Sequence, residues 1–143
     1  MTIKKIGIIG AGTMGHGIAL VAAKAGYDVI LHDVKDEYVK KGINSIEKFI
    51  NKSVEKGKMT PEDKNNILEK IHGTTKLEDM KDTDLIIEAI VEEVKIKKDL
   101  FQRINHFDKI VTLKIVDIFT INEVYIILFC SYSYYTIEDP AFG

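Results

Sequence analysis

The segment KIGIIGAGTMGHGIALVAAKAGYDVILHD, which runs from Lys5 to Asp33, decides the fold of this 143-residue chain. It contains an apolar run, the glycine pattern Gly10-x-Gly12-x-x-Gly15, a stretch with helical spacing, a second apolar run and an acid. Strand, glycine turn, helix, strand and acid, in this order, form the signature of a βαβ unit that binds a dinucleotide. The alternative is a coincidental glycine-rich turn in another kind of α/β domain, and the complete context disfavours it.

Each glycine of the turn has a physical task. Gly10 lets the chain turn sharply off the strand, Gly12 lets a pyrophosphate touch the backbone, and Gly15 lets the helix pack closely on the strand. The helix that begins there aims backbone N–H groups and the positive end of its dipole at the phosphates. We therefore predict a phosphate-binding loop that consists of Gly10, Ala11, Gly12, Thr13, Met14 and Gly15.

An acid follows the second strand. Asp33 lies 18 positions after Gly15, close to the separation of about 20 residues at which a carboxylate reaches the adenosine ribose hydroxyls. A carboxylate there would repel a 2′-phosphate, so the predicted cofactor is NAD rather than NADP. His16, in the first turn of the helix, and His32, beside the acid, are interpreted as neighbours of the site or solvated residues rather than as catalytic groups.

Apolar residues at helical spacing predict three helices. The first follows the glycine turn as an amphipathic or buried helix and stops at Gly26; its stripe is Met14, Ile18, Val21, Ala22 and Ala25. The second lies between Asp36 and Gly57 with one buried stripe, formed by Val39, Ile43, Ile46, Ile50 and Val54. The third begins at Thr60-Pro61-Glu62-Asp63, an N-cap followed by proline and acids, buries Ile67, Leu68 and Ile71, and ends at Gly73.

A further central strand is predicted from Asp84 to Ile90, with Glu88 near its carboxyl end. Ligands of doubly wound sheets bind beyond the carboxyl ends of the strands, so Glu88 could reach the cofactor. An ordinary acid at a strand end is the alternative. Glu92 and Glu93 are predicted to begin the next helix, where acids favour the helix dipole.

Composition restricts the class of protein. The net charge of −2 and the pI near 6.1 give no basic field for nucleic acid or for an anionic membrane. The one cysteine, Cys130, excludes an internal disulfide and suits a reducing compartment. The amino terminus enters a strand at once and resembles neither a signal peptide nor an anchor. We expect a cytoplasmic protein.

The last part of the chain has a different composition. Residues 110–143 contain five charged residues, against 37 in the preceding 109. The segment Val124–Cys130 is uncharged and high in β-propensity, which is typical of an aggregation-prone segment unless it is buried. One interpretation is a sheet strand at 109–114 followed by an edge strand. The other is that this tail is not the sequence with which the domain evolved, as after an altered reading frame or a gene truncation.

The motifs IGIIGAGTMGHGIA, LHD and, above all, DLIIEAIVEEVKIKKDLF from Asp84 to Phe101 carry a resemblance to a known family. They resemble the amino-terminal domain of the 3-hydroxyacyl-CoA dehydrogenases, especially the bacterial 3-hydroxybutyryl-CoA type, over roughly residues 3–107. The resemblance implies a Rossmann-type doubly wound parallel sheet with a helical hairpin insertion, NAD as the cofactor and an acyl-CoA as the substrate. It implies a NAD-binding domain at 1–107 and a divergent apolar tail at 108–143, with one or two further strands.

The same resemblance implies roles for particular residues. Gly10 to Gly15 would hold the pyrophosphate and Asp33 the adenosine ribose, while Glu88 and Glu93 would lie near the cofactor. The hairpin would help to hold CoA through the candidates Ser45, Lys48 and Lys52.

The chain also departs from the family pattern. We find neither the Asn-Thr-Ser-Ser motif nor the HFFNP-like segment that carries the family's histidine, and the helical domain through which the family forms homo-oligomers is absent. We predict no catalytic residue and no metal site in this chain. The activity that the resemblance implies is NAD-dependent oxidation of 3-hydroxyacyl-CoA, or its reverse, in fatty-acid or butanoate metabolism. We expect this chain to supply the NAD-binding half and to be inactive alone. A NAD-binding regulatory module and an inactive gene fragment are the alternatives.

Overall fold

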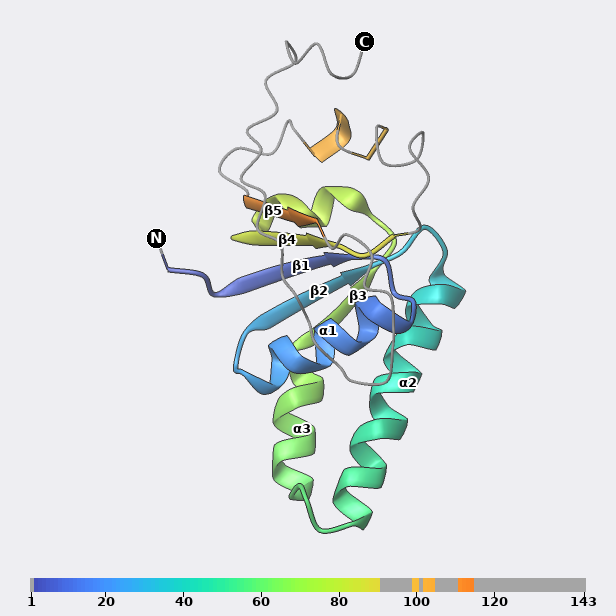
Figure 1. Cartoon of the computed structure of the whole chain (residues 1–143), viewed down its shortest axis with the longest axis vertical. Coiled ribbons are helices and arrows are strands. Elements are labelled where there is room, and N and C mark those ends of the chain that lie inside the picture. Colours follow the sequence, from blue (N-terminus) through green and yellow to red (C-terminus); the bar gives the residue numbers. More distant parts are fainter. Residues whose placement is uncertain (1, 91–98, 101, 105–110, 115–143) are drawn as a thin grey trace, which may run out of the picture.

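A computed structural model describes residues 2–90, 99, 100 and 102–104, and the backbone of residues 111–114. Five parallel strands form one sheet: β1 (Lys5–Ile9), β2 (Asp28–His32), β3 (Ile71–Thr74), β4 (Leu85–Glu88) and β5 (Val111–Lys114). The helices are α1 (Thr13–Lys24), α2 (Asp36–Glu55), α3 (Pro61–Glu69) and the 3₁₀ helix η1 (Leu77–Asp82) (Figure 1).

The strand order is β3-β2-β1-β4-β5. This is the order of the first five strands in a doubly wound dinucleotide-binding sheet. The chain leaves β1 toward one edge and later returns to the other side of β1 with β4. The carboxyl ends of β1 and β4 therefore flank the point where the topology switches, which is where such folds bind their ligands. The predicted Rossmann-type fold is confirmed.

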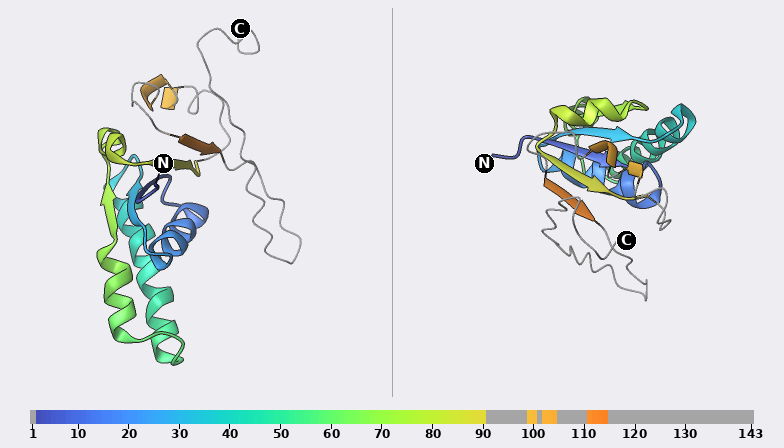
Figure 2. Two further views of the ribbon diagram at one scale, coloured as in Figure 1. Left: turned by 90° about the vertical axis from the view of Figure 1, so that its left-hand side faces the viewer. Right: turned by 90° about the horizontal axis from the view of Figure 1, so that it is seen from above.

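Apolar side chains cover both faces of the sheet. On one face, Ile8 and Leu31 are fully buried against α1, α2 and α3. On the other face, Ile9 and Ile86 pack in one cluster with residues of η1 and with Leu100 and Ile104. Figure 2 shows the ribbon of the sheet and its helices from two further directions. The sheet thus forms the middle layer, and its central strands contribute continuous apolar runs, as parallel strands buried on both faces do.

The hairpin of α2 and α3 extends away from the sheet (Figures 1 and 2). Within the predicted stripe of α2, Val39, Ile46 and Ile50 are buried. The start of α3 is the predicted N-cap: Thr60 Oγ1 accepts the N–H of Asp63 at 3.0 Å, and the Asp63 carboxylate accepts the N–H of Thr60 at 3.2 Å. This reciprocal capping box fixes the sharp turn between the two helices. The predicted helical hairpin insertion is confirmed.

The buried side of α1 differs from the predicted stripe. The residues that α1 buries are Gly15, Ala19, Leu20, Ala22 and Ala23. Met14 and Val21, which the spacing assigned to the buried side, are 44% and 61% exposed. The prediction failed because this helix is apolar around most of its circumference, so spacing alone cannot select the packed face.

The end of α3 was also predicted wrongly. The helix ends at Glu69, and Ile71–Thr74 is the strand β3, which pairs with β2 from Val29 to His32. Gly73 lies where α2 crosses the strand, because a Cβ there would come within 2.5 Å of a Val39 methyl group. Close packing of a helix on the strand, and not a helix end, explains this glycine.

β5 lies within the interval 109–114 for which a strand was predicted. The other predictions for the tail, including the one for the segment Val124–Cys130, lie outside the described residues. The domain boundary near residue 107 stays a prediction. No helix in the described part of the chain is long and apolar enough to cross a membrane.

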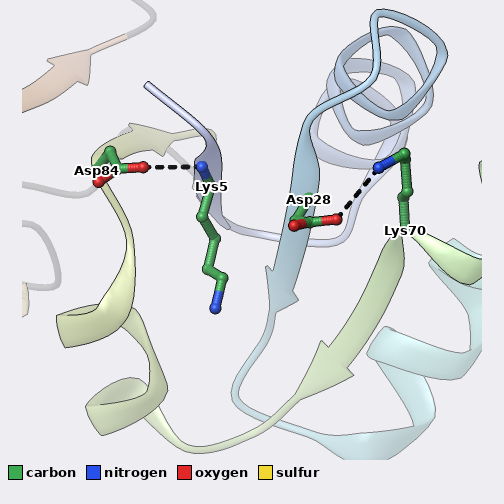
Figure 3. A network of polar contacts seen from close by, with 4 residues as sticks. All are labelled: Lys5, Asp28, Lys70 and Asp84. Atoms are coloured by element: carbon green, nitrogen blue, oxygen red, sulfur yellow. Dashed lines mark hydrogen bonds and ion pairs between the residues drawn. The ribbon is translucent and has the colours of Figure 1, made fainter. Parts of the chain in front are cut away.

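Carboxylates form hydrogen bonds and an ion pair at the end of the sheet where β1, β2 and β4 begin. Asp84, just before β4, accepts the backbone N–H groups of Lys4 and Lys5 at 2.8 and 2.9 Å. Asp28, at the start of β2, forms an ion pair of 3.4 Å with Lys70 (Figure 3). The Asp28–Lys70 pair lies at the surface and contributes little. Asp84 satisfies two main-chain donors that precede the β1–β4 ladder, and these hydrogen bonds lower the pKa of its carboxyl group.

We predict a pH-dependent loss of stability through Asp84. Because the folded-state pKa of its carboxyl lies below the unfolded value of about 3.9, the carboxylate stabilises the fold above that value and its contribution is lost as pH falls through the lowered pKa. Asp84→Asn should lower the urea midpoint near pH 7, and the difference from the parent chain should shrink below about pH 4. A difference that stays constant from pH 7 to pH 3 would contradict this role.

Candidate functional site

The glycine loop begins with a left-handed residue at the end of β1. Gly10 has a φ of +107°, and its N–H donates to the carbonyl of His32 at 2.8 Å. A Cβ at Gly10 would lie 2.5 Å from the carbonyl oxygen of Ala89, just past β4. The loop therefore leaves β1 in a direction that only glycine allows, against the end of the neighbouring strand.

The two other glycines of the pattern have different surroundings. A Cβ at Gly15 would lie 1.6 Å from the carbonyl oxygen of Gly10, so the first turn of α1 rests directly on the loop. A Cβ at Gly12 would meet nothing within 4 Å. Gly15 is needed by the fold itself, whereas the open space at Gly12 lies where a ligand could touch the backbone.

The first turn of α1 suits an anion. Gly12 is the N-cap and provides no side-chain acceptor, and no acid stands in the first turn. The N–H groups of Thr13, Met14 and Gly15 have no intrahelical partner, whereas that of His16 donates to the carbonyl of Gly12 at 3.0 Å. Thr13 and Met14 are exposed. Backbone donors and the positive end of the dipole thus face solvent together, which is the arrangement that binds phosphate.

Asp33 lies beside this loop. Its Oδ2 accepts the N–H of Ala11 at 2.9 Å, and its Oδ1 accepts the N–H of Val34 at 2.7 Å. A carboxylate has about four lone-pair sites, so these two hydrogen bonds leave acceptor capacity on both oxygens. The half-buried carboxylate could accept ribose hydroxyls while it holds the loop.

The hairpin contacts the same loop. A Cβ at Gly42 of α2 would lie 2.7 Å from the carbonyl oxygen of Ala11, so the two backbones approach closely. Ser45 follows within one turn, and its hydroxyl donates to the carbonyl of Lys41 at 2.9 Å. Lys48 and Lys52, both exposed, continue the same side of the helix at spacings of three and four residues. The three predicted CoA candidates therefore share one face of α2 that starts near the loop. Sequence reasoning missed Gly42, whose task depends on a contact distant in sequence.

Glu88 ends β4 and is completely buried. Its Oε1 accepts the N–H of Ile90 at 3.1 Å, and in the sheet it is paired with Ile9, directly before the glycine loop. The Glu88 carboxyl therefore lies in the interior, next to the carboxyl ends of β1 and β4, where the topology switches. Glu93 lies outside the described residues.

The two histidines near the loop differ in exposure. His16, in the first turn of α1, is half-buried. His32 is only 6% exposed, so of the two interpretations given for it the solvated residue is excluded, and the neighbour of the site remains, since its carbonyl accepts the N–H of Gly10. His32 lies on the same face of β2 as Ile30, which packs against the cluster on the η1 side of the sheet. Burial lowers the pKa of the His32 imidazole, with the negative charge of Asp33 opposing this shift. Burial therefore favours the neutral form of the His32 imidazole.

These features match what a dinucleotide requires: donors for a pyrophosphate, open backbone at Gly12 and a carboxylate at the end of β2. The fold and this loop together define a Rossmann-type dinucleotide-binding domain. The chain belongs to the 3-hydroxyacyl-CoA dehydrogenase family through its NAD-binding domain, because the family model described as "3-hydroxyacyl-CoA dehydrogenase, NAD binding domain" matches residues 5–113. Its cofactor is NAD.

Relatives of known name agree with this assignment. The chain is 50% identical over 107 residues to a probable 3-hydroxybutyryl-CoA dehydrogenase of Deinococcus radiodurans, a match covering 73% of this chain and 37% of the relative. It is 42% identical over 105 residues to the 3-hydroxybutyryl-CoA dehydrogenase of Clostridioides difficile, covering 73% and 37%. The chain thus matches little more than a third of these relatives.

Solved structures of the family superpose on the described fold. The (S)-3-hydroxybutyryl-CoA dehydrogenase of Ralstonia eutropha aligns with a TM-score of 0.76 and 34% identity, covering 79% of this chain and 41% of that one. The 3-hydroxybutyryl-CoA dehydrogenase of Escherichia coli aligns with a TM-score of 0.78 and 31% identity, covering 81% and 25%.

The contrast between two glycines gives a test of the loop. Gly15→Ala should destabilise the domain by at least about 1–3 kcal/mol, because the new Cβ meets a backbone oxygen that cannot move aside. Gly12→Ala should change the free energy of unfolding by less than about 1 kcal/mol, yet weaken NADH binding. Urea unfolding and NADH fluorescence titration measure the two quantities. Equal stability of both variants would show that α1 does not rest on Gly10 as described.

Proposed function

We propose that this chain supplies the NAD-binding part of an oxidoreductase that converts a 3-hydroxyacyl-CoA, such as 3-hydroxybutanoyl-CoA, to the 3-oxoacyl-CoA, or runs the reverse reaction, in fatty-acid or butanoate metabolism. The observation that carries the proposal is the combination of the loop and Asp33 with the lysine-bearing hairpin, in a chain that is 50% identical to a protein of that name. A bare dinucleotide sensor has no use for the hairpin.

Within this proposal, the cofactor binds along the carboxyl ends of β1, β2 and β4. Backbone N–H groups from Gly10 to Gly15 hold the pyrophosphate, and the Asp33 carboxylate accepts the hydroxyls of the adenosine ribose. The nicotinamide of a bound NAD accepts the hydride. Glu88, at the end of β4, would hold the nicotinamide side of the cofactor, and contact of Glu93 with the cofactor stays a prediction.

The acyl-CoA lies along the hairpin. Lys48 and Lys52 present two positive charges on one face of α2, and Ser45 adds a hydroxyl nearer the loop. Ammonium groups attract the phosphates of CoA. Because Gly42 brings α2 against Ala11, the two ligands would lie on adjacent surfaces.

We assign no catalytic base to this chain. The reaction requires a group that takes the hydroxyl proton, and a histidine held by a carboxylate is the natural choice. His32 is buried beneath the sheet end, and His72 lies on the edge strand β3. His16 stands in the first turn of α1, at the end of the helix assigned to the pyrophosphate. The proposal therefore places the proton acceptor outside this chain's described residues. We also propose that the protein is cytoplasmic.

NADH fluorescence titration followed by an acetoacetyl-CoA reduction assay tests the proposal. Saturable NADH binding together with turnover, or with turnover restored by a separately expressed carboxyl-terminal portion of a relative, supports it. Binding that never yields turnover under either condition favours an alternative, a regulatory NAD-binding module. Absence of saturable binding favours an inactive fragment and contradicts both.

Replacement of Asp33 tests the ribose assignment. Asp33→Ala should weaken NADH binding by about 1.5–3 kcal/mol, because a charge-assisted hydrogen bond is lost. Glu37→Ala, which removes a nearby exposed acid, is the matched control and should leave the dissociation constant unchanged. Unaltered NADH affinity in Asp33→Ala would show that another residue holds the ribose.

A further inference from the structure

We propose that Thr74 and Asp79 form a positioning pair for Asp33. The pair holds the carboxyl end of the edge strand β3, and this strand end in turn positions the main chain of Asp33. The pair itself contacts no ligand. The inference rests on the proposed function, in which Asp33 binds the adenosine ribose.

The need for such a pair arises from the weakness of β3. This strand has four residues, lies at the end of the strand order and pairs with β2 as its one neighbour among the described strands. It contains Gly73, which gives the main chain extra freedom. Such a short strand, hydrogen-bonded on one side, frays easily unless other contacts hold it.

Thr74 supplies those contacts at the last position of β3. Its hydroxyl donates to Oδ2 of Asp79 and accepts the N–H of Lys76 at 3.0 Å. Asp79 belongs to η1, whose Leu77 and Met80 are buried against the sheet. The end of β3 is therefore attached to an element that is anchored in the core.

The attachment reaches the site through the main chain. The N–H of Asp33 donates to the carbonyl of Thr74 at 3.3 Å, one residue beyond the β2–β3 pairing, which ends at His32. The turn after β3 thus holds the end of β2 through its main chain.

The position of the Asp33 main chain determines where its carboxylate can act. The two carboxylate oxygens are already held by Ala11 and Val34, so a displaced main chain would force the carboxylate to leave one of these partners or the ribose. A binding group must stay within about 0.5 Å of its productive geometry to keep its full effect. The Thr74–Asp79 pair supplies this constraint from the side of the sheet edge.

A double-mutant cycle tests the proposal. Thr74→Val removes the hydroxyl at nearly constant shape and should weaken NADH binding by about threefold to tenfold. Thr74→Ser keeps the hydroxyl and should retain the parent affinity. Thr75→Val is the matched control, because it makes the same change in an exposed side chain next to Thr74. In the Asp33→Ala background, Thr74→Val should have no further effect on NADH binding.

The outcomes separate this inference from the proposed function. If Asp33→Ala itself leaves NADH affinity intact, the ribose assignment fails, and with it the inference. If Asp33→Ala weakens binding but Thr74→Val does not, or weakens it equally in both backgrounds, the positioning role alone is overturned. Asp79→Ala removes the acceptor from the other side and should reproduce the effect of Thr74→Val; it decides the question should Thr74→Val not fold.

Discussion

The close contact between the first turn of α1 and the end of β1 is the constraint on which the rest of the structure depends. The Cα of Gly15 lies so near the carbonyl of Gly10 that no side chain fits between them. This contact sets the direction of α1 and leaves its amino-terminal N–H groups facing outward. Because a backbone oxygen and a backbone carbon form the contact, no change of rotamer can relieve it, and the loop has essentially one shape.

Three further elements use that shape as their support. Asp33 at the end of β2 bonds to the N–H of Ala11, Gly42 of α2 packs on the carbonyl of Ala11, and Ala89 after β4 lies against Gly10. Each of these contacts involves a backbone atom of the loop. The loop can therefore hold the acid, the hairpin and the strand end while its remaining donors stay available to a ligand.

Local patterns predicted the parts of the site that have local causes. The glycines, Asp33 and the capping box at Thr60 were recognisable because each task is fixed by neighbours within a few residues or by a common unit. The packed face of α1 was not, because Met14 and Val21 are as apolar as the residues that are buried. Ile71 extended the helical spacing of α3, but pairing with β2 outweighed it. Gly42 and Gly73 carried no local signal, since the atoms that require them belong to other elements.

The two predicted anion sites use different physics, and this difference explains their arrangement. The loop offers backbone donors and a helix dipole without any basic side chain, so it can bind a pyrophosphate only at short range and in one orientation. The lysines of α2 are flexible point charges that attract phosphate at longer range and with less directional preference. A cofactor whose reactive ring must be placed accurately needs the first kind of site, whereas the distant phosphates of a large thioester need only the second. The backbone contact between Gly42 of α2 and Ala11 of the glycine loop joins the two sites. It keeps a fixed distance between the loop and α2, even though the lysine side chains are flexible.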